Sequence, residues 1–343
     1  MQRMIFALII SLAIVLAVAP KVIPWLRKLK FGQTIYDLGP QSHKVKQGTP
    51  TMGGLMMGAS VLVTALITHP AGWYGAQDFM LALLAVSILS MLVGFADDYI
   101  KVAKKRSLGL TPWQKIAGQV FIAVGFSVYC YLHPMVGSSI FVPLFNVEWD
   151  LGLFYIPLMS LLMIFMINSA NLQDGLDGLL SGVTVVGSVA WGMMALIFMT
   201  AVSAMNNVMY TDNYYAVAIF AMAVCGAAMG FLRFNHYPAS VFMGDTGSMF
   251  IGGATVGMAM LLRQPIMLAL IAFTMVCSSL SVIIQRIYFK VTHGKRIFKM
   301  SPIHHHFELS GYSETQICAM YAVVTGVLSL IAVLSLYGLQ LVK

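Results

Sequence analysis

Two carboxamides and two carboxylates interrupt the apolar sequence between residues 168 and 182, NSANLQDGLDGLLSG. Asn168 and Asn171 are three residues apart, as are Asp174 and Asp177, so each pair would share a helix face wherever its part of the stretch is helical. One such residue could cap the following helix, but four are more than capping requires. Membrane spans rarely contain polar and ionisable groups, so the stretch indicates a functional site.

Three further carboxylates lie beside other apolar segments. Asp97 and Asp98 are adjacent in FADDY, and Asp245 lies between two glycines in MGDTGS. Neighbouring carboxylates repel each other unless a cation or a shared proton lies between them. Oxygen ligands of this kind suit Mg²⁺, which usually completes its shell with water and substrate phosphate. We therefore expect the fold to bring these aspartates together around a magnesium ion.

Two loops carry groups that are suited to bind phosphate. The three histidines of SPIHHHFE cannot all face one point on a helix, because neighbours lie about 100° apart. With no thiol nearby, binding of phosphate through imidazole N–H groups, or ordering of a loop, is favoured over a zinc site, and a solvated histidine run is the alternative. Lys46 and Thr51 precede the second apolar segment, where a phosphate contact and a simple membrane anchor are equally compatible with the lysine.

The composition excludes a soluble globule. Of the 343 residues, 59% are hydrophobic and only 9% are charged, against about 25% charged in soluble domains. With about 20 residues per span, the sequence predicts an all-α polytopic membrane protein of one domain, residues 1–343. Its ten expected helices are roughly 4–25, 50–68, 78–96, 113–133, 153–170, 178–203, 214–232, 246–262, 265–289 and 317–341.

Most lysines and arginines fall on one face of this predicted topology, which makes that face cytoplasmic and both termini extracytoplasmic. The cytoplasmic loops, about 26–49, 97–112, 168–178, 233–248 and 290–316, hold the polar motifs. The segment from His133 to Gly152 on the other face could form a small β-hairpin. Close helix contacts are expected at three pairs with small-xxx-small spacing, namely Gly54 and Gly58, Gly178 and Gly182, and Gly253 and Gly257.

Metal-binding carboxylates, phosphate-binding donors and a basic cytoplasmic rim together favour phosphoryl transfer to a membrane lipid. At this point a resemblance is evident. The segments GTPTMGG, FADDY, NSANLQDGLDGL, FNHYPASVFMGDTGS and SPIHHHFE, in this order over about 260 residues, resemble the phospho-N-acetylmuramoyl-pentapeptide transferase family, one of the polyprenyl-phosphate N-acetylhexosamine-1-phosphate transferases.

The resemblance implies a bacterial plasma-membrane enzyme. It would transfer phospho-N-acetylmuramoyl-pentapeptide from its UDP derivative to undecaprenyl phosphate with Mg²⁺, releasing UMP and forming lipid I for peptidoglycan. It also implies a homodimer and a bent ninth helix beside a lipid groove, with no nucleic-acid partner. By motif position, Asp245 and Asp98 would bind the metal ion, and Asp97, Asp98, Asp245, His304 and His305 would be catalytic. The implied substrate-binding residues are Lys46, Thr51, Asn168, Asn171, Asp174, Asp177, Asn235, Phe242, Gln285 and His306.

Two alternatives remain open. A related transferase with another UDP-sugar donor would share the acidic motifs, although the contiguous PIHHHFE argues against it. A transporter would share the hydropathy, but its charged residues would be expected near the middle of the spans, often in repeated halves. Here they lie at the ends of the spans, which favours the enzyme.

Overall fold

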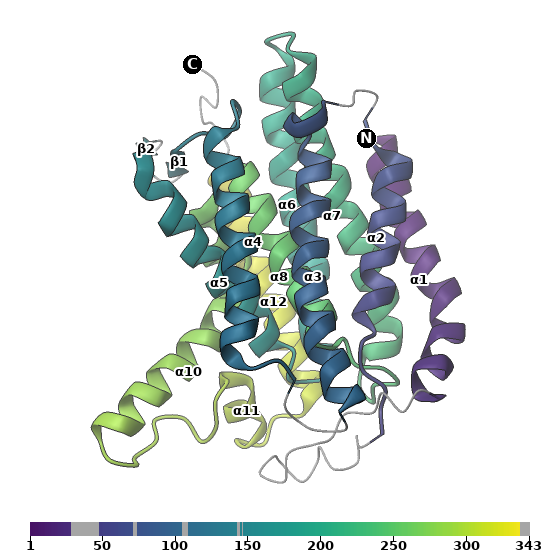
Figure 1. Cartoon of the computed structure of the whole chain (residues 1–343), viewed down its shortest axis with the longest axis vertical. Helices are drawn as coiled ribbons and strands as arrows, with labels where there is room; N and C mark the ends of the chain where they lie inside the picture. Colours follow the sequence, from purple (N-terminus) through teal and green to yellow (C-terminus); the bar gives the residue numbers. More distant parts are fainter. Residues whose placement is uncertain (29–47, 71–73, 105–108, 143–144, 146, 337–343) are drawn as a thin grey trace.

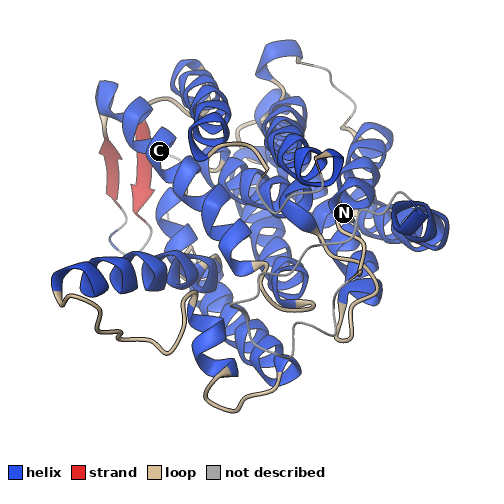
Figure 2. Ribbon diagram, turned by 60° about the horizontal axis from the view of Figure 1, so that its bottom comes forward, coloured by secondary structure: helices blue, strands red, loops and turns tan. Residues whose placement is uncertain are grey.

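The computed structural model describes residues 1–28, 48–70, 74–104, 109–142, 145 and 147–336. These residues form a bundle of long helices with two short strands at its edge (Figures 1 and 2). The helices are α1 (Gln2–Lys28), α2 (Gly54–Thr68), α3 (Phe79–Ala103), α4 (Pro112–Leu132), α5 (Tyr155–Gln173), α6 (Leu179–Ser203), α7 (Val208–Asn235), α8 (Gly244–Leu261), α9 (Leu268–Ile271), α10 (Phe273–Val291), α11 (Ile303–Glu308) and α12 (Glu314–Leu334). Single 3₁₀ turns precede α3, α5 and α9, at Gly75–Gln77, Gly152–Phe154 and Pro265–Met267.

Local sequence explains where several of these helices begin. Thr111 and Gln114 form a capping box at the start of α4, with Pro112 in the first turn, where its missing N–H has no cost. Ser313 and Gln316 form a second capping box at the start of α12. Each predicted apolar range overlaps one of these helices or, at residues 265–289, a pair of them, although the observed ends differ from the predicted ones by several residues.

Among the described residues, seven helices are long and apolar enough to cross a membrane, or eight if a bent pair counts as one span. They are α1, α3, α4, α5 with its preceding 3₁₀ turn, α6, α7 and α12. Helix α2 is an apolar helix of 15 residues, shorter than the roughly 20 residues of a typical span. The chain is therefore a multi-pass membrane protein, whereas the count of ten spans stays a prediction.

The range 265–289, predicted as one helix, is broken. The segments Pro265–Ile271 and Phe273–Val291 meet at an angle of 88°, and α10 leaves the bundle sideways (Figure 1). The break falls at Ala272, whose φ of −108° and ψ of 24° depart from helical values. The residues around it are apolar except Thr274, so hydropathy carries no sign of the bend. A bent helix at this place agrees with the resemblance.

The predicted hairpin is confirmed. Strands β1 (Ser139–Val142) and β2 (Val147–Asp150) are antiparallel, with Ile140 opposite Trp149. Arg263, which follows α8, fastens the hairpin to the bundle: its carbonyl oxygen accepts a hydrogen bond from the Phe141 amide at 2.9 Å, and its guanidinium lies 3.2 Å from a Glu148 carboxylate oxygen. The hairpin therefore marks the end of the bundle where α8 finishes.

Helix α8 forms the centre of the core, since every residue from Thr246 to Leu261 is buried. It packs against α3 and α5. A methyl group added at Gly253 would lie 2.7 Å from Ser90 Oγ, and one at Gly257 would lie 3.0 Å from Val86 Cγ1. These glycines make the close helix contact that their spacing predicts. The prediction is wrong at Gly182, where an added methyl group would meet no atom within 4 Å.

Candidate active site

The last turns of α3 and the first turn of α8 bring Asp97, Asp98 and Asp245 together. One carboxylate oxygen from each lies within 4.8 Å of the others, which confirms that the fold gathers these distant aspartates. The contact depends on Gly94, one turn earlier in α3, because a Cβ atom there would overlap the backbone carbonyl of Asp245. Asp97 and Asp98 are buried, and the Asp245 side chain is 16% exposed.

The three carboxylates share one arrangement. Each carboxylate accepts a hydrogen bond on one oxygen. Asp97 accepts from the Leu110 backbone amide at 2.9 Å, and Asp98 from the Thr246 backbone amide and hydroxyl at 2.9 and 2.7 Å. Asp245 accepts from the side-chain Nδ2 of Asn171 at 2.7 Å. The other oxygen of each faces the Lys101 ammonium, at 2.6, 3.6 and 3.2 Å respectively. The cluster is thus built around a cationic position.

Lys115 at the start of α4 adds a second ammonium group, 2.8 Å from Asp245 Oδ2. Sequence reasoning used Lys101 and Lys115 for membrane topology alone and missed them as site residues. A local signal existed for Lys101, since it follows Asp97 by four residues and an Asp–Lys pair at this spacing shares a helix face. No comparable signal links Lys115 to an aspartate 130 residues away.

The two predicted asparagines have different surroundings. Asn171 donates to Asp245 and also to Ser248 Oγ at 2.9 Å, so it belongs to the carboxylate cluster. Asn168 instead donates to Gln119 Oε1 of α4 at 2.8 Å and to the Ile164 carbonyl. Asn168 therefore links α5 to α4, one helical turn from the cluster.

Residues 174–178 form turns between α5 and α6, so the expectation that Asp174 and Asp177 share a helix face does not apply. Asp174 is half-buried; burial, followed by the charges of Asp245, Asp98 and Asp177, raises its pKa to about 8. Asp177 is buried and accepts a hydrogen bond from the Ala239 amide at 2.9 Å. Its own amide donates to Glu314 at 3.1 Å, a residue that sequence reasoning gave no role.

Backbone contacts join three more predicted residues to the same end of the bundle. The Phe242 amide donates to the Pro50 carbonyl at 2.8 Å, which places Phe242 beside Thr51. Asn235 accepts hydrogen bonds from the Gly178 amide and the Ser181 hydroxyl. Gly244 has a φ of +72°, and an added Cβ would lie 2.5 Å from Asp98 Oδ2 and 2.6 Å from Thr51 Oγ1. Lys46 lies outside the described residues.

The histidine run forms α11 beside the turn that follows α5. His304 is fully buried, and a Cβ atom on Gly175 would overlap its imidazole Nε2. His305 Nδ1 lies 3.1 Å from Glu308 Oε2, and His306 Nδ1 accepts a hydrogen bond from the Lys299 amide. The neighbouring loop is held by Gln285 of α10, which accepts from the Ile297 and Phe298 amides. The histidine run thus contacts the stretch 168–182 through His304. Gln285 instead holds the loop that contains Ile297 and Phe298.

The helical fold and this acidic site define a membrane-embedded member of a transferase family. The model of "Glycosyl transferase family 4" matches residues 80–263, the part of the chain that contains all three clustered aspartates. The whole chain is similar to proteins named phospho-N-acetylmuramoyl-pentapeptide-transferase. That of Halalkalibacterium halodurans is 45% identical and that of Caldicellulosiruptor bescii 43% identical, each over 96% of both chains. That of Bacillus velezensis is 46% identical over 93% of this chain and 94% of its own.

The chain therefore belongs to the phospho-N-acetylmuramoyl-pentapeptide-transferase family. These relatives are bacterial, and together with the apolar helices they identify a multi-pass bacterial membrane protein.

Proposed function

We propose that this chain transfers phospho-N-acetylmuramoyl-pentapeptide from UDP-N-acetylmuramoyl-pentapeptide to undecaprenyl phosphate, with Mg²⁺, forming lipid I and UMP for peptidoglycan synthesis. The relatives' shared name supports the reaction. The observation that carries the proposal is the cluster of three inward-facing carboxylate oxygens around one ammonium group. A diphosphate donor needs positive charge at such a place, and a divalent ion with two lysines would supply it.

The residues present fit Mg²⁺. The Lys101 ammonium contacts one oxygen of every carboxylate and so takes the position of a cation, and all three donors are hard oxygens, as Mg²⁺ prefers. Asp98 and Asp245 would hold the ion. When bound, Mg²⁺ would neutralise charge on the donor diphosphate. Lys101 and Lys115 would then be free to turn toward the phosphate groups, which would bring two ammonium groups to the transferred phosphorus.

Direct attack by the acceptor is the favoured chemistry. An oxygen of undecaprenyl phosphate bonds to the sugar-bearing phosphorus while the bond from that phosphorus to the bridging oxygen breaks, and UMP leaves with the electron pair. A phosphomonoester has a second pKa near 6, so the acceptor needs little help from a base. Asp97 would take any remaining proton, with Asp98 able to exchange roles because the two are adjacent. Asn171 would orient Asp245, and His304 and His305 would cover the donor.

The active site would face the cytoplasm. The loops beside the carboxylates carry most of the basic residues, which membrane insertion keeps inside. The proposal includes ten spans, both termini outside, and a homodimer as the resemblance implies.

The assay that tests the function uses purified protein, UDP-N-acetylmuramoyl-pentapeptide with a labelled sugar, undecaprenyl phosphate and Mg²⁺. We expect label to enter a lipid-soluble product together with one UMP per product, and chelation of Mg²⁺ to stop both. UDP-N-acetylglucosamine is tested in parallel as the donor that a sister transferase would use. Preference for that donor would replace the proposal with a sister transferase, and absence of transfer from either would overturn it.

A second measurement separates direct attack from a covalent intermediate. Enzyme without lipid is mixed with labelled donor and Mg²⁺. Direct attack predicts no burst of UMP and no label on the protein. A burst of one UMP per active site, with phospho-sugar retained on Asp97 or Asp98 after denaturation, would establish the two-step route instead.

A further inference from the structure

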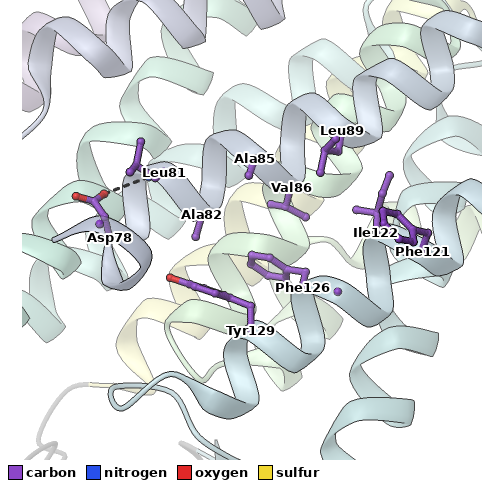
Figure 3. Close-up of a pocket in the computed structure, with 12 residues that line it drawn as sticks. Asp78, Leu81, Ala82, Ala85, Val86, Leu89, Phe121, Ile122, Phe126 and Tyr129 are labelled. Carbon is purple, nitrogen blue, oxygen red and sulfur yellow. Dashed lines mark hydrogen bonds between the residues drawn. The ribbon is translucent and has the colours of Figure 1, made fainter. Parts of the chain in front are cut away.

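An apolar pocket lies between α3 and α4, in the half of the bundle nearer the hairpin. Its volume is about 470 Å³, within the range of about 300–1,000 Å³ that small-molecule sites occupy. Figure 3 shows Ala82, Ala85 and Val86 of α3 facing the rings of Phe126 and Tyr129 of α4 across it. Leu89 lines the end of the pocket nearer the carboxylates, and from it eight residues of α3 lead to Asp97, about 12 Å along the helix. The pocket is therefore separate from the carboxylate site.

The residues lining the pocket are small where two helices would normally touch. Ala82, Ala85 and Gly125 could let α3 and α4 approach closely, as small residues do in membrane bundles. Here they border open space instead. An unfilled volume of this size forfeits the dispersion contacts of every atom that lines it. Another molecule is needed to restore those contacts.

The inner wall of the pocket is closed and its mouth is open. Val86 and Phe126 both contact α8 at Gly257, where an added methyl group would lie 3.0 and 3.8 Å from their side chains. On the outer side, Leu89 is 43% and Phe121 is 79% exposed. Because α3 and α4 are both candidate membrane spans, these exposed apolar side chains face the hydrocarbon of a bilayer. The molecules at the mouth are therefore lipid chains.

One polar atom inside the pocket indicates the orientation of the occupant. The Tyr129 hydroxyl is buried and has no hydrogen-bond partner in the part of the chain that the structure describes. Its ring is held between Phe126 and His133, at centroid distances of 5.9 and 5.4 Å, so the hydroxyl has a fixed direction, toward the end where Asp78 lies (Figure 3). A buried hydroxyl without an acceptor is costly. The occupant should therefore supply an acceptor at this end.

We propose that this pocket binds one acyl chain of a bilayer glycerolipid, whose ester carbonyl accepts a hydrogen bond from the Tyr129 hydroxyl. The position of Tyr129 along α4 agrees with this orientation of the lipid. Tyr129 lies three residues before the end of α4 at Leu132, or about 4.5 Å along the helix, close to the membrane boundary where tyrosine and lipid ester groups are found. From there the chain runs along Ala82 and Ala85 toward Leu89 and Phe121. The ligand is a structural lipid, distinct from the acceptor lipid of the reaction.

The test uses the full-length protein in mild detergent, with a phosphatidylglycerol that carries a photoreactive group on one acyl chain. Crosslinked residues are mapped by mass spectrometry, and bound lipid is counted on the intact protein. We expect crosslinks within 81–89 and 121–129. Ala85→Phe should fill the pocket and abolish both signals. Ala59→Phe is the matched control, since Ala59 is an exposed alanine in an apolar helix, α2, away from the pocket.

A second pair of measurements tests the hydrogen bond and does not depend on the folding of Ala85→Phe. Tyr129→Phe should weaken binding by about two- to tenfold, the range for one hydrogen bond, whereas Tyr131→Phe on the same helix should not. A diether lipid, which lacks the carbonyl, should bind the wild type as weakly as the diester lipid binds Tyr129→Phe. Equal crosslinking in Ala85→Phe and Ala59→Phe would overturn the site. Equal binding of diether and diester lipids would overturn the assignment of the ester. Neither readout involves activity, so the transferase proposal stands or falls separately.

Discussion

Two ammonium groups and three carboxylates give the active site an incomplete charge balance. Lys101 contacts all three aspartates and Lys115 contacts Asp245 alone, so one negative charge remains before any ion or substrate arrives. The remaining charge would favour the divalent cation of the proposed reaction, whereas the lysines would keep the cluster stable without one. The sequence predicted the aspartates, because adjacent acids beside apolar runs are unusual. It could not predict the lysines as site residues, because lysine and arginine are common at the cytoplasmic ends of membrane spans whether or not a site is present.

Asp245→Asn should lower turnover by about 100-fold or more at ordinary Mg²⁺, since an amide is a poor ligand for a hard cation and offsets no charge. The variant should still fold, because the single amide oxygen can keep the hydrogen bond from Asn171 and only the contacts of Oδ2 with Lys101 and Lys115 are lost. Turnover and thermal unfolding are measured together, with Asp150→Asn, an exposed hairpin acid, as the control. Near wild-type turnover by folded Asp245→Asn would remove the metal assignment.

Gly175→Ala should weaken donor binding and turnover, because the added methyl group displaces the His304 imidazole from the turn. The control is Gly182→Ala, where the methyl group meets no atom within 4 Å and alanine suits helix α6 better than glycine. The KM for the UDP donor and the kcat of both variants are compared with wild type. If Gly175→Ala behaves as Gly182→Ala does, the position of His304 has no part in the reaction.

Asp174 should make stability fall as pH rises between about 4 and 8. Its pKa is about 8 in the folded chain and about 3.9 in an unfolded one, so across this range the folded chain keeps a proton that the unfolded chain has lost. The stabilisation that protonated Asp174 gives the folded chain is fully present below about pH 4 and gone above about pH 8. Apparent unfolding temperatures of wild type and Asp174→Asn should therefore diverge between pH 5 and 8. Parallel curves would contradict the raised pKa.

At the scale of elements, the sequence predicted helices better than their connections. Continuous apolar runs located α1 to α8 and α12, since membrane helices must satisfy their own backbone hydrogen bonds. The same rule failed at Ala272, because both halves of the broken segment are apolar. Sequence alone also could not show that Asn168 and Asn171 have different partners. Both carboxamides lie on α5, but only the contacts of α4 and α8 decide that one binds Gln119 and the other Asp245.

Gln285→Leu should loosen the loop that follows α10, since three hydrogen bonds with Ile297 and Phe298 are lost. Trypsin should then cleave faster at Lys295 and Arg296 in this loop. Ile287→Ala, an exposed change on the same helix, is the control for altered helix stability. Unchanged cleavage would show that other contacts hold the loop, and the implied substrate-binding role of Gln285 would become the better explanation of its burial.

At the scale of the molecule, the candidate active site and the hairpin lie at opposite ends of the bundle. The carboxylates, the turns after α5 and the histidine run share one end, whereas α1 begins and α12 finishes at the other end, which is also the end of the hairpin (Figure 1). An even number of crossings would give this arrangement. The sequence predicts both termini on one side of the membrane from the distribution of basic residues, which records membrane insertion rather than packing.

The proposed orientation predicts which loops an impermeant thiol reagent can reach in intact cells. The four native cysteines are replaced by alanine, and single cysteines are introduced as Met205→Cys, between α6 and α7, and Lys295→Cys, after α10. Both positions are exposed. Met205→Cys should be labelled from outside, and Lys295→Cys only after the cells are opened. The reverse pattern would place the active site outside the cytoplasm.

The burial of α8 has a consequence for how the chain is made. Its residues from Thr246 to Leu261 are all enclosed by protein, so in the finished molecule the bilayer does not solvate this helix. Its two main neighbours, α3 and α5, precede it in the chain and leave the ribosome first. Helix α8 can therefore pass from the insertion machinery into a cleft that is already assembled. The order of synthesis protects a glycine-rich segment with an acidic first turn from a period alone in lipid.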